Sequence, residues 1–502
     1  MKKNLIILCI TALMLLSCSD WLDVNHDPNA LEEIPSASSL LPASEVGIGN
    51  NLMGWDMGFG GAFWVEYWTQ SNSASQFKSI CGYMPEDFNT AYRSLYSQPL
   101  TDLKRIKDMT VEDENRGYYF IAEALSIYAW QIVTDVWGDM PYFEALKGNE
   151  GILHPKQDKQ QDIYADLKTR IDELLKIDIR NSSIIGSSDY IFGGDLNQWY
   201  AFANSLKLKL MIRLSETENY NNADVLNFIE SGGFLTGSAS ISGDIWNDNM
   251  EGKRHPMREF ETGGANYFTS NVFACKTFID YLSVNADPRL STLFSGVVKG
   301  AFFGDFGSTE DSDNNGTTDD KETYAKAILL PNMDIPLISA WELNFWISEV
   351  YARAGNDAKA KEYYENGVKA SLAQHGISDE SIIGTGGYAE WKSGDIEVAI
   401  KQIAMQKWVA NCNYQHIEAF LERNRTKYPS VNEIDIARDR QSAWINFPVG
   451  ELTISVAGRG TLGGNLPASP TYPEWYVSRN NNAPAQKANI GQKVWWNQKA
   501  GK

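Results

Sequence analysis

The residues whose types and spacing most directly suggest chemistry form an acidic stretch from residue 311 to residue 322. Oxygen-bearing side chains recur at loop positions 1, 3, 5, 9 and 12, with Gly316 at the sharp turn. This is the ligand spacing of a calcium-binding loop, in which position 7 contributes a backbone carbonyl. The expected metal ligands are Asp311, Asp313, Asn315, Thr317, Asp319 and Glu322.

A solvated acidic loop without a metal is the alternative interpretation of this stretch. The residues from Gly304 to Thr309 are poorly suited to a helix that enters the loop, so a complete EF-hand is not expected. We expect bound calcium to rigidify a surface loop, which is a structural role. No organic cofactor is expected.

Aromatic side chains are the second candidate for ligand contact. They make up 12% of the chain, which is enough either to fill a helical core or to face planar ligands such as sugars. The run from Trp55 to Trp68 has partly helical spacing, so a core-facing stripe and a sugar platform both remain open. The aromatic residues chosen as candidate ligand contacts are Trp64, Trp68, Tyr83, Trp246 and Tyr267.

Sequence signatures of catalysis are mostly absent, and we expect a binding protein rather than an enzyme. The five His residues are isolated, and no segment matches H-E-x-x-H, G-x-S-x-G or the P-loop. A surface glycoside hydrolase stays an alternative, because the carboxylate pair of such an enzyme leaves no sequence spacing. Acidic residues outnumber basic ones 64 to 44, and the net charge of -20 argues against a nucleic-acid partner.

The first residues have the pattern of an export signal. Two Lys residues precede an apolar run that is too short to span a membrane, and the run ends in Leu-Leu-Ser before Cys18. This ending resembles a bacterial lipobox. We therefore expect residues 1–17 to be a lipoprotein signal peptide and Cys18 to carry the lipid, with residues 18–40 as an N-terminal tether.

Most of the remaining sequence has the period of amphipathic helices. Apolar residues recur at steps of three and four from Tyr118 to Val136, and similar stripes run through residues 163–174 and 202–214. Residues 341–371 predict a helical hairpin with its turn at Gly355. We predict a mostly α fold, in which tetratricopeptide-like hairpins form a scaffold with long irregular loop insertions.

The predicted loop insertions are the places where ligand contacts are expected. They lack a sustained period, are aromatic or rich in Gly, and cover residues 41–84, 232–269, 291–321 and 457–484. No linker composition divides the chain, so residues 18–502 are expected to form a single domain.

Several sequence segments in the predicted helices and loops resemble those of a known family. They run from Asp135 to Glu144, Trp199 to Arg213, Asp287 to Leu290 and Glu362 to Ser371, and Tyr472-Pro473 is followed by Asn480-Asn-Asn482. These segments follow a lipobox in an order that resembles that of the SusD/RagB family of Bacteroidetes outer-membrane lipoproteins, in its divergent SusD-like branch. The residues of these segments are expected to support the fold rather than to contact ligand.

The resemblance implies a nutrient-binding lipoprotein that faces the cell exterior. Such a protein sits over a SusC-like TonB-dependent porin, is held in the outer membrane by its lipid anchor, and delivers oligosaccharide to the porin. Peptide cargo in the same role is an alternative. A purely structural adaptor, whose helical hairpins grip a protein and whose loops bind nothing, is another.

Overall fold

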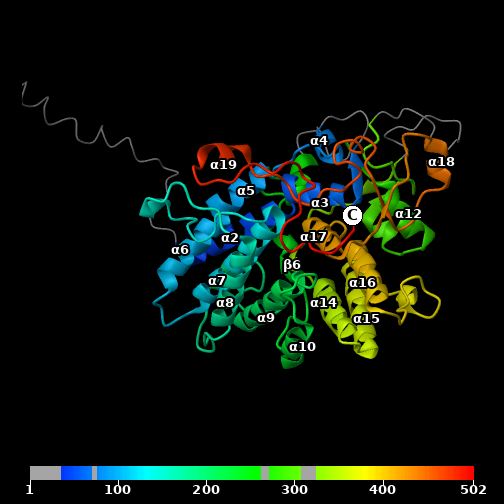
Figure 1. The fold of residues 1–502 in the computed structure, drawn as a ribbon. Helices are drawn as coiled ribbons and strands as arrows, with labels where there is room; N and C mark the ends of the chain where they lie inside the picture. The colour runs from blue at the N-terminus through cyan, green and yellow to red at the C-terminus, as the bar shows by residue number, and fades with distance from the viewer. Residues whose placement is uncertain (1–35, 71–75, 262–270, 307–323, 502) are drawn as a thin grey trace, which may run out of the picture.

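Helices account for most of the regular structure in this protein, as the sequence predicts. The computed structural model describes residues 36–70, 76–261, 271–306 and 324–501 (Figure 1). The signal peptide, the lipidation residue Cys18, the candidate ligand contact Tyr267 and all six calcium ligands lie outside these residues and stay predictions. The longer helices are α2 (Ala37–Leu52), α6 (Thr101–Thr110), α7 (Gly117–Trp137), α8 (Gln160–Leu174), α9 (Leu196–Arg213), α10 (Asn222–Ser231), α12 (Lys276–Val284), α14 (Ala340–Arg353), α15 (Asp357–Gln374), α16 (Ile396–Asn411) and α17 (His416–Thr426).

The remaining elements are short and are spread along the chain. The short α-helices are α3 (Gly60–Trp64), α4 (Lys78–Cys81), α5 (Asn89–Leu95), α13 (Leu290–Leu293), α18 (Arg440–Ile445) and α19 (Glu474–Arg479). Two π-helical turns are η1 (Trp55–Phe59) and η2 (Tyr96–Leu100). The strands are β1 (Trp68–Gln70), β2 (Ala239–Ile241), β3 (Val272–Ala274), β4 (Phe294–Ser295), β5 (Lys326–Ala327), β6 (Ile335–Ile338), β7 (Val431–Asn432) and β8 (Leu452–Thr453).

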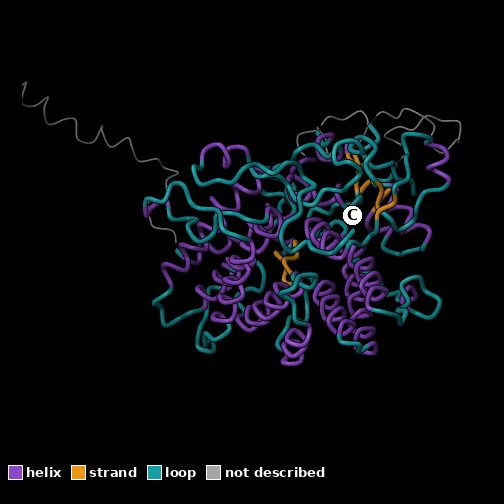
Figure 2. The backbone as a smooth tube through the Cα atoms, viewed as in Figure 1, coloured by secondary structure: helices purple, strands orange, loops and turns teal. Residues whose placement is uncertain are grey.

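These elements segregate into a helical half and a half that is rich in loops. Helices α7 to α10 and α14 to α16 fill the lower half of the view in Figure 1, and loops with short helices cover them above. Figure 2 shows the strands as isolated short pieces. Within the described residues they form antiparallel pairs β1–β3, β2–β6 and β4–β5 and the parallel pair β7–β8.

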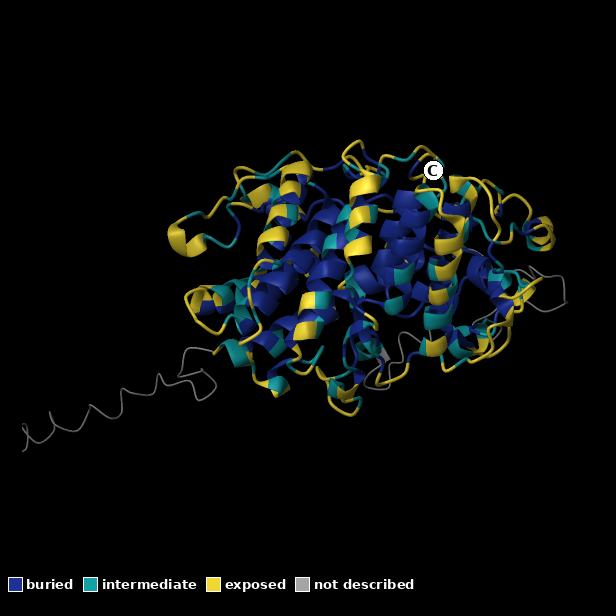
Figure 3. Cartoon of the chain, turned by 90° about the horizontal axis from the view of Figure 1, so that it is seen from below, coloured by how far each residue is buried: buried dark blue, intermediate teal, exposed yellow. Residues whose placement is uncertain are grey.

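The predicted helical hairpin is confirmed by α14 and α15, which pack against each other. Gly355 turns the chain with a φ of 73°, which glycine adopts without steric cost. The side chain of Asn356 then accepts a hydrogen bond from the Lys359 amide and so caps α15. Seen from below, the helices expose their outer sides and bury their inner ones (Figure 3).

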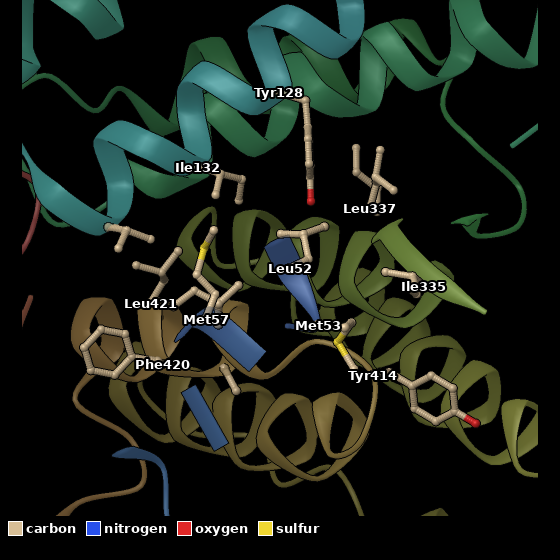
Figure 4. Packing of buried hydrophobic residues seen from close by; sticks show 14 of the residues in the cluster. Leu52, Met53, Met57, Tyr128, Ile132, Ile335, Leu337, Tyr414, Phe420 and Leu421 are labelled. Carbon is tan, nitrogen blue, oxygen red and sulfur yellow. The ribbon is translucent and has the colours of Figure 1, made fainter. Parts of the chain in front are cut away.

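The segment from residue 41 to residue 84 is more regular than we predicted. It contains most of α2, which begins inside the predicted tether with Ser36 as its N-cap. Helix α2 packs against α6, α7 and β2, so it has little exposed polar surface and its helical period is weak in the sequence. Figure 4 shows its last residue, Leu52, in the core with side chains from α7, β6 and α17.

A network of buried charges joins the helices of the two halves. Arg213 of α9 pairs with Asp135 of α7 at 2.9 Å and with Glu418 of α17 at 2.6 Å. Glu418 also contacts the ammonium group of Lys209 at 2.6 Å. The buried charge network consists of Asp135, Lys209, Arg213, Glu342, Glu349, Lys407, Glu418, Glu422 and Arg425.

Mutual pairing makes this burial of charge tolerable. Burial alone would raise the pKa of Glu418, but Lys209 and Arg213 lower it well below its ordinary value. Burial raises the pKa of Asp135 to about 6 in spite of Arg213. At the end of the network, Arg425 bonds both Glu349 at 2.5 Å and Glu422 at 2.6 Å. Removal of one partner would leave the others charged and desolvated.

We predict that Arg425→Met lowers the free energy of unfolding by about 3–5 kcal/mol, because Glu349 and Glu422 lose their buried counter-ion. Urea unfolding followed by circular dichroism measures the change. Arg180→Met is the matched control, since Arg180 pairs with Asp178 at the surface and such pairs contribute about 0–1 kcal/mol. Equal losses in the two variants would contradict this account of the network.

Glu66 is a buried acid outside the network. Its carboxylate accepts hydrogen bonds from the Thr277 hydroxyl and, at 2.7 Å, from the Thr453 amide. Burial raises the pKa of Glu66 to about 8, although these donors and the Arg423 guanidinium act in the opposite direction. The acid is therefore held largely protonated near neutral pH.

The raised pKa of Glu66 predicts a pH-dependent stability. The folded state keeps a proton that the unfolded state releases above its pKa of about 4.5, so the contribution of Glu66 is full below pH 4.5 and is lost as the pH rises through 8. Glu66→Gln mimics the protonated acid and should flatten that fall. Urea unfolding at several pH values measures it, with exposed Glu112→Gln as control. If the free energy of unfolding of Glu66→Gln fell with pH as steeply as that of the wild type, the raised pKa of Glu66 would be refuted.

Candidate ligand-binding site

Three of the aromatic residues chosen from the sequence lie in the hydrophobic core. Trp64, Trp68 and Tyr83 are at most 2% exposed. The Trp64 ring stacks on Phe88 with centroids 4.9 Å apart, and the Trp68 ring packs edge-on against His416 at 4.7 Å. Trp64 and Trp68 therefore follow the core-facing alternative for the run from Trp55 to Trp68 rather than the sugar platform. Tyr83, which was expected to contact ligand from an irregular loop, is buried as well.

Trp246 differs from those three because part of its side chain remains accessible. Its ring nitrogen donates to the Met333 carbonyl at 3.2 Å, and its ring packs edge-on against His255 at 5.7 Å. These contacts hold the ring in place at the surface. Trp246 stays a candidate contact.

A pocket of about 370 Å³ lies where three distant segments of the chain meet. They are α5 with η2, the loop between α7 and α8, and α19 with the residue after it. Its lining is mostly aromatic and aliphatic, as in sites that bury the faces of small organic ligands. The lining residues are Tyr92, Tyr96, Pro141, Ala145, Leu146, Leu153, Pro155, Trp475, Tyr476, Arg479 and Asn480.

The aromatic rings of this pocket support one another. Tyr92 stacks on Tyr96 with centroids 5.0 Å apart and meets Trp475 edge-on at 6.0 Å. Tyr92 is buried, whereas Trp475 keeps part of its side chain accessible, and Leu153 at the rim is 75% exposed. An accessible indole ring backed by buried rings is a rigid surface on which a flat apolar face can stack.

Hydrogen bonds hold the loop between α7 and α8 in place. The backbone amides of Tyr142 and Phe143 both donate to one carboxylate oxygen of Asp158 at 2.9 Å. The amide groups of Asn480 and Asn482 donate to the carbonyls of Pro155 at 2.8 Å and His154 at 2.5 Å. Hydrogen bonds within the protein therefore hold the pocket wall in place before any ligand binds.

Helix α19 owes its position to the residues at its two ends. Pro473 precedes it and supplies an extended entry, and the amide of Asn480 closes it with a hydrogen bond to the Tyr476 carbonyl at 3.0 Å. The ring nitrogen of Trp475 donates to the side chain of Asn89 on α5. The Tyr96 hydroxyl donates to the Pro141 carbonyl at 2.7 Å and ties η2 to the loop.

A second pocket of about 560 Å³ lies on the other side of α19, between Asp87, Tyr472, Glu474 and Lys487. The Lys487 ammonium donates to the carbonyls of Trp137 and Pro470 and to a hydroxyl. Burial lowers the pKa of Lys487 to about 7. This lysine has bonding partners within the protein, so it supports the fold rather than offering an open contact.

Arg479 and Asn480 are the polar residues of the first pocket besides its aromatic rings. Its lining contains no carboxylate and no His or Cys. Across the described residues, no group of three or more His, Cys, Asp or Glu side chains is placed to hold a metal ion. His416, the first residue of α17, is buried and accepts a hydrogen bond from the Asn413 amide at 2.8 Å, and burial lowers its pKa to about 3.

Comparison with known proteins places the chain in a family. A protein-family model described as "Starch-binding associating with outer membrane" matches residues 28–446. The chain therefore belongs to the SusD-like family of nutrient-binding proteins, as its sequence phrases suggested. No helix among the described residues is both long and apolar enough to cross a membrane.

Solved structures share the fold over nearly the whole chain. A SusD homolog from Bacteroides uniformis aligns with a TM-score of 0.67 and 20% identity, covering 93% of this chain and 100% of that one. A chitin-binding protein gives 0.68 and 20%, and a SusD-like protein from Bacteroidetes AC2a gives 0.69 and 17%, each covering 92% of this chain and 100% of its own. No curated protein sequence matches.

Sequence reasoning missed the aromatic pocket, although two of its signals were visible. Residues 457–484 were predicted to be a ligand-contacting loop, and α19 with Trp475 lies inside that range. The segments around Pro141 and Asn480 were expected to support the fold, and the hydrogen bonds of these two residues agree with that role. The same two residues also line the pocket. Only the fold brings Tyr92 beside Trp475 across 382 intervening positions.

We predict that Asn480→Ala loosens the pocket wall, because it removes the hydrogen bond that Asn480 donates to the Pro155 carbonyl and the one that its side-chain oxygen accepts from the Asn482 amide. The loss should lower the free energy of unfolding by about 1–2 kcal/mol and speed hydrogen exchange in residues 142–157. Asn481→Ala is the control, since the Asn481 side chain is exposed. Exchange as slow as in the wild type would disprove the role of Asn480.

Proposed function

We propose that this protein is a lipid-anchored, outward-facing glycan-binding component of an outer-membrane uptake system. It captures oligosaccharide in the aromatic pocket beside α19 and delivers it to a SusC-like TonB-dependent porin without chemical change. The lipid on Cys18 is the membrane attachment in this proposal. Family membership supports nutrient binding at the outer membrane, and the cargo and the porin are inferred from it.

The single observation that carries the cargo assignment is the accessible Trp475 ring in a pocket of about 370 Å³. Pyranose rings present C–H faces that stack on indole rings, and each such contact contributes roughly 1 kcal/mol. A volume of this order accommodates a short stretch of sugar, the rest of which would lie across the open rim at Leu153. Modest affinity suits transport, because the cargo must leave again.

Peptide cargo and hydrolysis are weaker interpretations of the same pocket. The pocket lining has no carboxylate to act as a general acid or nucleophile, which a glycosidase would require as a pair. Incubation with a glycan panel and measurement of reducing ends would reveal hydrolysis. A basic peptide would meet the positively charged Arg479 at the pocket, which disfavours it.

We predict that Trp475→Ala weakens oligosaccharide binding about fivefold or more, since it removes the accessible stacking surface of the pocket. A glycan array first identifies bound oligosaccharides, and isothermal titration of the purified protein then gives the affinities. Trp246→Ala is the comparison, because Trp246 is also partly accessible and lies elsewhere. A loss in Trp246→Ala alone would place the site at Trp246 and refute the pocket beside α19.

A further inference from the structure

Arg479 is the charged side chain in the lining of the aromatic pocket. It lies at the end of α19 and is exposed. It forms no ion pair and no side-chain hydrogen bond with the residues that the structure describes. The exposed Arg180, in contrast, pairs with Asp178 at 2.5 Å. In a chain with 64 acidic and 44 basic residues, an arginine left without a carboxylate partner at a pocket calls for an explanation.

Three of the other polar side chains around the pocket already have partners, and the hydroxyl groups of Tyr92 and Tyr476, which have none among the described residues, are buried. The Asn480 amide donates to the Pro155 carbonyl, the Tyr96 hydroxyl donates to the Pro141 carbonyl, and the Trp475 ring nitrogen donates to Asn89. The rest of the lining offers mainly ring faces and aliphatic carbon. The pocket therefore presents a ligand with two features: a flat apolar surface and an uncommitted guanidinium group.

From these two features we infer that the pocket selects an acidic sugar, whose ring stacks on Trp475 while its carboxylate pairs with Arg479. This inference rests on the proposed function, because it names the class of glycan that the same pocket takes. A guanidinium group presents parallel N–H donors that match the two oxygens of a carboxylate, so it suits the C6 carboxylate of a uronic acid. A neutral hexose offers only hydroxyl groups there.

Local charge decides this selection, in spite of the net charge of the protein. A formal charge of -20 disfavours anions at long range, but salt screens such fields beyond about 8 Å at physiological ionic strength. The nearest acid on the same helix, Glu474, lines the pocket on the other side of α19. The guanidinium group of Arg479 therefore meets an incoming carboxylate without an ion pair that must first be broken.

The test compares each acidic oligosaccharide with its own neutral form. Tetrasaccharides of homogalacturonan, alginate and hyaluronan are titrated into the full mature protein before and after reduction of their carboxyl groups to alcohols. We expect the wild type to bind at least one acidic form about fivefold or more tightly than its reduced form. Arg479→Gln should abolish that preference and leave the affinity for the reduced form unchanged.

Two variants serve as controls in the same titrations. Arg438→Gln removes an exposed arginine close to α18, which lies on the opposite side of the loop-rich half from α19 (Figure 1), and it should leave both affinities unchanged. Trp475→Ala should weaken the acidic and reduced forms alike. The Arg479→Gln variant must retain the wild-type circular dichroism spectrum and unfolding midpoint.

The outcomes separate this inference from the proposed function. Binding of neutral glycans with no preference for any acidic form overturns the selection by Arg479 and leaves the glycan-binding function standing. Equal losses for both forms in Arg479→Gln also overturn it, because the side chain would then act only through pocket shape. Failure of every acidic and neutral glycan to bind, on the panel and on the array, overturns both.

Discussion

The pairing of buried charges at the centre of the molecule is the constraint on which the rest of the structure depends. Asp135, Lys209, Arg213 and Glu418 come from three helices that are far apart in the sequence, and none of the four has access to water. A charge in such a place is tolerated only when its counter-ion arrives in the correct position. Helices α7, α9 and α17 therefore have little freedom to shift past one another.

The rigidity of that centre has an effect at the surface. Helix α7 ends at Trp137, and the loop that follows it starts from this fixed point before it reaches the pocket. The Trp137 ring nitrogen donates to the Asp87 carbonyl at 2.9 Å, and its carbonyl accepts from Lys487. Both contacts position the segments that carry the pocket rings. The aromatic pocket is thus held by the scaffold rather than by its own short helices.

The scaffold was predictable where apolar residues recur with the helical period and where a turn residue marks the boundary between two helices. The steps of three and four from Tyr118 to Val136 and the turn at Gly355 correspond to α7 and to the hairpin of α14 and α15. Helix α2 was missed because Pro42 lies inside it and its buried positions include small or polar residues such as Ser44 and Gly47, which interrupt the apolar period. The aromatic residues that follow α2 resembled a ligand platform, although Trp64 and Trp68 belong to the core.

The pocket itself could be predicted only in part, for a physical reason. The periodic spacing of apolar residues identifies a single helix, whereas a pocket depends on which segments of the chain meet in space. Residues 457–484 were expected to contact ligand, and the pocket does draw on them. Nothing in the local sequence links Trp475 to Tyr92 or leaves Arg479 without a carboxylate, because both facts arise from long-range packing. The calcium loop and Cys18 stay predictions.

The position of α19 in the chain has a consequence for how such proteins diversify. The family match ends at residue 446, so one wall of the pocket comes from the matched part and the other from the chain that follows it. The residues of the buried charge network all lie before residue 446. Substitutions at exposed or partly exposed positions such as Trp475 and Arg479 can therefore alter the recognition surface without touching the buried charge network.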